Sequence, residues 1–124
     1  MSKKILLLDD DSDILEILSI ILIESGYEIK ALNSGNTVFE EIKRFQPDLV
    51  LMDVMLGDMD GRTICRSIKE NKVTSNLPVI LISGTHDLYL SLNQPGAPND
   101  FVAKPFDIEI LLKRIDRELA GNAA

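Results

Sequence analysis

The chain of 124 residues has one cysteine, one histidine and no tryptophan. A lone Cys65 cannot close a disulfide within the chain, and Cys65 with His86 supplies too few ligands for a zinc centre. Basic residues are also scarce, since 13 Lys and Arg stand against 20 Asp and Glu, giving a net charge of −7. This charge disfavours binding to nucleic acid or to an anionic membrane, and we expect neither partner.

Long hydrophobic runs are missing as well. No stretch approaches the roughly 18 apolar residues that a membrane span needs. Lys3 and Lys4 followed by residues 5–8 resemble the start of a signal peptide, but three aspartates follow this short run and exclude export. The hydrophobic fraction of 45% favours one folded domain. We therefore expect a cytoplasmic protein that forms one domain over residues 1–124, with no output domain in this chain.

Short apolar runs alternate with segments of helical periodicity. Runs without an alternating pattern are typical of strands buried on both faces, and they occur at residues 5–8, 49–52, 78–82 and 101–103. Residues 27–32 alternate loosely and predict an edge strand. Apolar stripes predict helices at about residues 13–25, 38–45, 61–70 and 108–119. Five strands alternating with helices predict an α/β fold, a doubly wound five-stranded parallel sheet.

The segment between the last two predicted strands departs from this alternation. Residues 88–92 are apolar enough for a short helix, but Pro95 and Pro98 prevent a long one. We therefore expect a shortened or irregular fourth helix, followed by a loop.

Polar side chains stand where four of the predicted strands end. Asp9 and Asp10 follow the first strand, and Asp53 ends the third. Ser83 and Lys104 follow the fourth and fifth strands. The carboxyl ends of parallel strands share one edge of a sheet, so we expect these five side chains to meet. Crowded carboxylates without His or Cys suit Mg²⁺, while a hydroxyl and an ammonium can stabilise a developing anion, as phosphoryl transfer to or from a carboxylate requires.

These motifs resemble the receiver domain of two-component response regulators, of the single-domain, chemotaxis-regulator-like kind. The resemblance extends over essentially the whole chain and is carried by Leu8-Asp9-Asp10-Asp11, Met52-Asp53, Asp60-Gly61, Ser83 and Lys104-Pro105-Phe106. It implies a flavodoxin-like fold with strand order 2-1-3-4-5. It also implies a switch protein or phosphoryl relay that assists its own phosphorylation and dephosphorylation, and that is not an enzyme in the usual sense.

The resemblance implies a role for each strand-end residue. Asp53 would accept a phosphoryl group from a sensor histidine kinase or a histidine phosphotransfer protein. Asp10, Asp53 and the backbone carbonyl of Met55 would bind Mg²⁺ directly, with Asp9 acting mainly through water. Ser83 and Lys104 would contact the phosphoryl group, Ser83 and Phe101 would form the switch, and the Lys104-Pro105 bond would be cis. The resemblance also implies a downstream protein target, which the sequence does not identify. We expect the chain to be a monomer or a weak dimer.

Three features depart from the family pattern. Gly57 stands where the family usually has Pro, and Leu56 replaces a Met, so the loop after Asp53 is expected to be looser. Gly84 stands where Ala is common. The proline-rich segment after Gly84 replaces the usual fourth helix, which puts the output surface in doubt.

Other interpretations remain open. A receiver-shaped protein–protein adaptor that is never phosphorylated would have lost site residues. A phosphatase of the Asp-x-Asp type needs a second acid, which Asp53-Val54-Met55 lacks, and a nucleotide or flavin protein would carry a glycine-rich phosphate loop. Separately, Ser83 can begin a turn and Phe101 can be ordinary core packing. Ile20 and Ile23 fall on the polar face of the first predicted helix, as ordinary surface residues or as a docking face for a helical histidine-bearing partner.

Overall fold

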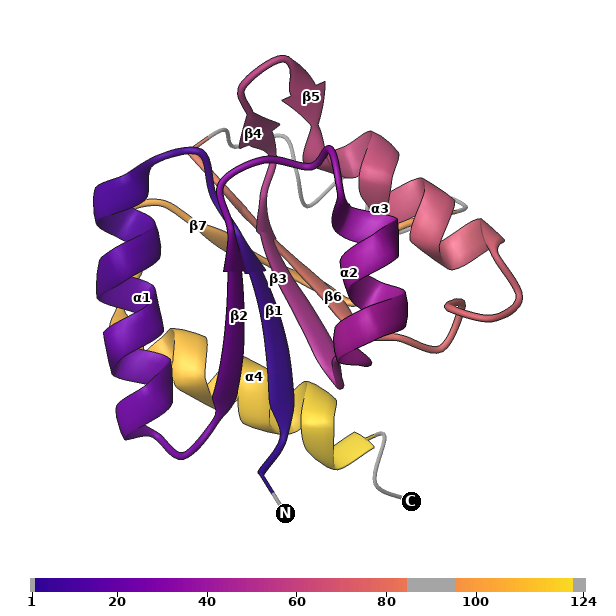
Figure 1. Cartoon of the computed structure of the whole chain (residues 1–124). Coiled ribbons are helices and arrows are strands. Elements are labelled where there is room, and N and C mark those ends of the chain that lie inside the picture. Colours follow the sequence, from indigo (N-terminus) through magenta and orange to yellow (C-terminus); the bar gives the residue numbers. More distant parts are fainter. Residues whose placement is uncertain (1, 85–95, 122–124) are drawn as a thin grey trace.

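The computed structural model describes residues 2–84 and 96–121 as alternating strands and helices (Figure 1). In chain order the elements are β1 (Lys4–Leu8), α1 (Ser12–Glu24), β2 (Glu28–Leu32), α2 (Val38–Phe45), β3 (Leu49–Asp53), β4 (Met55–Leu56), β5 (Met59–Asp60), α3 (Gly61–Glu70), β6 (Val79–Ser83), β7 (Asp100–Ala103) and α4 (Ile108–Gly121). The helix expected within residues 88–92 lies outside the described residues.

Five strands form one parallel sheet in the order β2-β1-β3-β6-β7. Counting only these five strands, this is the order 2-1-3-4-5, so the expected doubly wound, flavodoxin-like fold is confirmed. α1 and α4 cover one face of the sheet, and α2 and α3 cover the other (Figure 1). None of the described helices is both long and apolar enough to cross a membrane.

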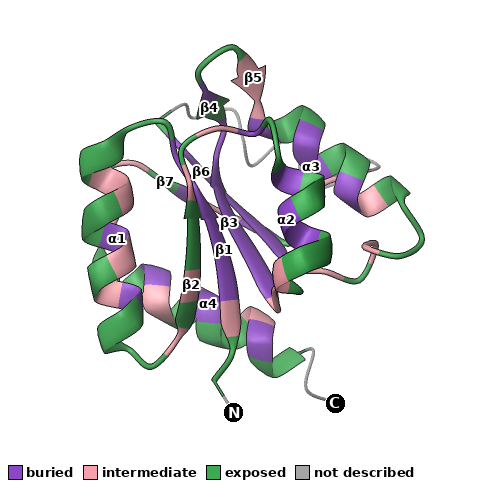
Figure 2. Cartoon of the chain, in the orientation of Figure 1, coloured by how far each residue is buried: buried purple, intermediate pink, exposed green. Residues whose placement is uncertain are grey.

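The central strands are buried on both faces, as the unbroken apolar runs predicted. Every residue of β3 and of β6 is buried, and alternate side chains enter different cores. In β3, Val50 and Met52 pack on the side of α2 and α3, whereas Leu49 and Leu51 pack on the side of α1 and α4. Strand β2, by contrast, is largely exposed or half-buried and lies at the edge of the sheet (Figure 2).

Capping residues mark the beginning of α1 and α3, and a glycine follows the end of α1. Asp11 caps α1, because its carboxylate accepts the N–H groups of Asp13 and Ile14. Gly26 has φ +97 just beyond the end of this helix, where a left-handed residue is favoured. Asp60 caps α3 by accepting the Arg62 N–H at 2.8 Å.

Candidate functional site

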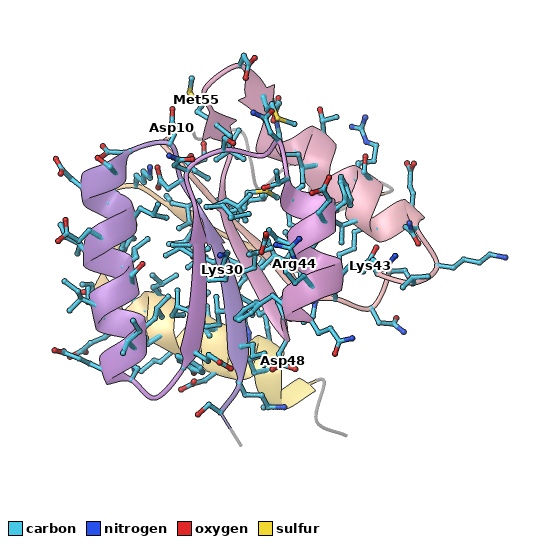
Figure 3. The ribbon with its side chains drawn as sticks, viewed as in Figure 1. Asp10, Lys30, Lys43, Arg44, Asp48 and Met55 are labelled. Atoms are coloured by element: carbon cyan, nitrogen blue, oxygen red, sulfur yellow. The ribbon has the colours of Figure 1, made fainter. Side chains whose placement is uncertain are left out.

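The carboxyl ends of four strands converge at one edge of the sheet. Strand pairing aligns Leu8 with Met52, Asp53 with Ile82, and Ser83 with Ala103. The side chains expected to meet therefore lie at one level of the sheet, and we call them the strand-end site: Asp9, Asp10, Asp53, Ser83 and Lys104. Figure 3 shows Asp10 at this end, while Asp48 lies at the opposite end, where the chain termini also lie.

Lys104 links two carboxylates of the strand-end site. Its Nζ lies 2.7 Å from Asp53 Oδ2 and 3.6 Å from Asp9 Oδ2. The backbone of Lys104 is held at the tip of β6, because its N–H donates to the Ser83 carbonyl at 2.8 Å. The Lys104-Pro105 bond is cis, as the resemblance implied. Lys104 is therefore an ordered part of the site and not a freely solvated charge.

Burial and charge together set the protonation of the strand-end site. Asp9 is only 1% exposed, and this burial, reinforced by the negative charge of Asp53, raises the pKa of its carboxyl group. The Asp11 N–H and the Lys104 ammonium oppose that rise without cancelling it. For Lys104, burial alone would lower the pKa, but the hydrogen bond and charge of Asp53, with the charge of Asp9, raise it. Lys104 accordingly stays an ammonium at neutral pH.

The carboxylates can hold a cation. One oxygen from each of Asp9, Asp10 and Asp53 lies within 4.8 Å of the others. Within residues 2–84 and 96–121, the buried Asp9 Oδ2 accepts no hydrogen bond and has only the Lys104 ammonium at 3.6 Å, so a bound cation would stabilise it further. An all-oxygen set with one exposed carboxylate fits Mg²⁺, which prefers few carboxylates and keeps several waters. Met55, whose carbonyl was expected to join this set, lies beside the site and donates its N–H to Asp53 Oδ1 at 3.1 Å.

A short hairpin, which the sequence reasoning missed, follows Asp53. Strands β4 and β5 pair antiparallel across a loop of two residues, Gly57 and Asp58. Leu56 is buried and packs in the core on the side of α2 and α3. The Gly57 N–H donates to Asp10 Oδ2 at 3.2 Å. A Gly-x pair between short apolar segments is a known hairpin signal and would have predicted this turn.

The hairpin returns to the tip of β3 through Gly61. Its N–H donates to the Val54 carbonyl at 2.7 Å. A Cβ on Gly61 would lie 2.4 Å from the Asp53 carbonyl oxygen and 3.0 Å from Val54 Cα. The residue after Asp60 is thus held against the backbone of Asp53, which explains why a glycine stands there.

The two proposed switch residues lie on neighbouring strands. Ser83 is 2% exposed at the end of β6, and Phe101 is half-buried on β7, against the core on the side of α2 and α3. Asp100, the buried residue that precedes Phe101 in β7, forms ion pairs with two arginines of α4. Arg114 and Arg117 lie 2.8 and 2.6 Å from its carboxylate oxygens. The sequence reasoning missed this network, although arginines three apart on one helix were its visible signal.

Comparisons with known proteins agree with this geometry. The family model described as "Response regulator receiver domain" matches residues 5–116. The DNA-binding response regulator MtrA of Mycolicibacterium smegmatis is 33% identical over 125 residues, covering 98% of this chain and 53% of MtrA. The response regulator PleD of Caulobacter vibrioides is 36% identical over 118 residues, covering 93% of this chain and 26% of PleD. The chain thus spans about half the length of the first of these relatives, and less of the second.

A solved structure extends the similarity to three dimensions. The signal receiver domain of a signal transduction histidine kinase from Syntrophus aciditrophicus superposes with a TM-score of 0.87 at 30% identity. The match covers 97% of this chain and 92% of that one. A family model over most of the chain, together with a shared fold, leads to one conclusion: this chain belongs to the response regulator receiver domain family.

Proposed function

We propose that Asp53 accepts a phosphoryl group from the phosphohistidine of a sensor kinase or of a histidine phosphotransfer protein. A carboxylate oxygen of Asp53 attacks phosphorus while the P–N bond to the donor imidazole breaks. The imidazole nitrogen keeps the electron pair of that bond and takes up a proton from water, which leaves the donor histidine as a neutral imidazole. The observation that carries this proposal is the contact of 2.7 Å between Lys104 Nζ and Asp53 Oδ2, beside the unsatisfied Asp9 Oδ2.

Lys104 and Ser83 supply the positive charge and the hydrogen-bond donor for the phosphoryl oxygens. Lys104 carries a raised pKa, so it remains charged while the developing phosphate gains negative charge next to it. Ser83 is buried at the adjacent strand tip, within the same edge of the sheet. Lys104 already contacts Asp53 before the reaction, which reduces the reorganisation needed during transfer.

Asp9, Asp10, Asp53 and the carbonyl of Met55 would hold Mg²⁺. The ion supplies a positive charge that offsets the repulsion between the carboxylates and the incoming phosphoryl group. Asp9, buried and with a raised pKa, contributes an oxygen that accepts no hydrogen bond from the described part of the chain. Asp10 is exposed, so its carboxylate can bind the ion in place of solvent without any movement of the core.

The chemical change at Asp53 would be transmitted through Ser83 and Phe101 to a partner surface. Phosphorylation then selects among conformations that differ in partner affinity, and the chain acts as a switch or relay in the cytoplasm, as a monomer or weak dimer. Residues 1–124 act as one receiver unit. The alternative of an adaptor that is never phosphorylated is disfavoured, because such a protein has no need to keep all five strand-end residues.

A phosphotransfer assay tests this proposal. The purified protein is incubated with a phosphorylated histidine phosphotransfer domain, or with acetyl phosphate, in Mg²⁺ and in excess EDTA. We expect phosphoryl incorporation with Mg²⁺ and loss of it with EDTA. Incorporation that is equal in EDTA would refute the metal role, and none from any donor in a panel of kinases would favour the adaptor.

A further inference from the structure

The β4–β5 hairpin donates backbone N–H groups to two carboxylates of the strand-end site. The Met55 N–H lies 3.1 Å from Asp53 Oδ1, and the Gly57 N–H lies 3.2 Å from Asp10 Oδ2. The donors are two residues apart, so they face the same side of an extended segment. One short hairpin therefore contacts both the central carboxylate and the exposed one.

The contact from Gly57 depends on its being a glycine. Gly57 has φ +66 as the first residue of the two-residue loop, a position that favours glycine in hairpins. Proline, which the family usually has here, fixes φ near −65° and has no N–H. A chain with proline could neither adopt this turn nor donate this hydrogen bond, so the contact to Asp10 arises from a departure from the family pattern.

Asp10 is the carboxylate that most needs such a contact. Asp9 is buried and accepts the Asp11 N–H, and Asp53 is held by the Met55 N–H and by Lys104. Asp10 is exposed, and within residues 2–84 and 96–121 its carboxylate accepts one hydrogen bond, from Gly57. Without that bond its side chain would sample several rotamers, and binding an ion would have to order it.

We propose that Gly57 is a positioning residue for Mg²⁺, whose N–H orients the Asp10 carboxylate toward the ion. The inference rests on the proposed function, because it assumes that the strand-end site binds Mg²⁺. A carboxylate has about four lone-pair directions, so accepting one N–H leaves others for a cation. Hydrogen bonds to metal ligands typically contribute about 10-fold to 100-fold in affinity. Since the Gly57 loop is exposed, we expect an effect of about 10-fold, at the lower end of that range.

The test is the Mg²⁺ dissociation constant of three proteins, measured by isothermal titration calorimetry with the metal alone. Gly57→Pro removes the N–H, and Leu56 before it is already extended, as a residue preceding proline must be. Gly57→Asn is the matched control, because it keeps the N–H and asparagine tolerates positive φ. A Cβ at this position meets no atom within 4 Å, so the asparagine side chain has room. Proline must change the φ angle of the turn as well as remove the N–H, so a second background is needed to separate the two effects. We expect Gly57→Pro to weaken Mg²⁺ binding about 10-fold and Gly57→Asn to bind like the wild type.

The same pair of variants in an Asp10→Ala background, which has no side-chain acceptor for the Gly57 N–H, separates positioning from general disturbance of the loop. If Gly57 acts through Asp10, Gly57→Pro has little further effect there, whereas a disturbed loop would lower affinity by the same factor in both backgrounds. Equal affinity of Gly57→Pro and wild type overturns the inference, as does an equal loss in Gly57→Asn. A wild-type protein that binds no Mg²⁺ refutes the metal role itself, and that result is distinguishable from both.

Discussion

Replacing Gly61 by alanine tests how tightly the hairpin is held against Asp53. The added Cβ would lie 2.4 Å from the Asp53 carbonyl oxygen and 3.0 Å from Val54 Cα. Both are backbone atoms of the tip of β3, so no side chain can rotate away and the backbone itself must shift. Gly61 has no positive φ, so the penalty is steric. Overpacking of this kind costs about 1–3 kcal/mol, and we expect about 2 kcal/mol.

Gly84→Ala is the matched control for this substitution. A Cβ there meets nothing within 4 Å, and alanine is common at this position in the family. Both substitutions restrict the unfolded chain equally, which by itself stabilises by about 0.4–1 kcal/mol. At roughly 4 °C per kcal/mol for a domain of this size, Gly61→Ala should melt about 8 °C below Gly84→Ala and about 5 °C below wild type, because the steric cost is partly offset by the effect on the unfolded chain; Gly84→Ala should melt at or slightly above wild type.

Thermal melts followed by far-UV circular dichroism suit this chain, which has no tryptophan. The Gly61→Ala variant should also bind Mg²⁺ more weakly, because the displaced backbone carries the Asp53 carboxylate and its Met55 donor. If Gly61→Ala and Gly84→Ala melt at the same temperature, the close approach of Gly61 to β3 is not a constraint and this reasoning is wrong.

Three further predictions concern protonation, reactivity and docking. Because the pKa of Asp9 is raised in the fold, the stability contributed by its protonated form is lost as pH rises through that pKa. Asp9→Asn should therefore raise the melting temperature of the metal-free protein at pH 7, and this gain should vanish at low pH. A lower melting temperature at pH 7 would contradict this prediction. Cys65 is fully buried and its thiol pKa is raised to about 11, so a thiol reagent at pH 8 should modify the native protein only as fast as it opens, and rapid labelling would contradict its burial. Ile20 is 51% exposed on the outer face of α1, and Ile20→Ser should slow phosphotransfer from a helical donor if that face docks the partner; an unchanged rate with intact folding would leave Ile20 an ordinary surface residue.

The sheet and the placement of the five residues at strand ends could be predicted, because both follow from patterns in the linear sequence. Unbroken apolar runs marked strands buried on both faces, and the placement of Asp53 or Lys104 at a strand end follows from the run stopping there. The strand tips then meet because parallel strands share one edge.

The sequence could not supply contacts that depend on side-chain direction or on short tertiary approaches. Asp60-Gly61 entered the sequence analysis only as a motif of the resemblance, and nothing in the sequence indicated that Gly61 lies against the Asp53 carbonyl oxygen. The Asp100 network needs β7 and α4 to be placed side by side before its arginines can be paired with it. The hydrogen bond from Gly57 to Asp10 joins residues 47 apart in the chain and depends on one positive φ angle.

The most direct test of this account is to locate the phosphoryl group on the protein. The chain is phosphorylated with acetyl phosphate or a phosphorylated donor in Mg²⁺, and the modified residue is identified by peptide mass spectrometry, in wild type and in Asp53→Asn. Asp10 is exposed beside Asp53 and is the natural competitor for modification. We predict modification at Asp53 alone and none in Asp53→Asn; labelling of Asp10, or wild-type labelling of Asp53→Asn, would contradict the assignment.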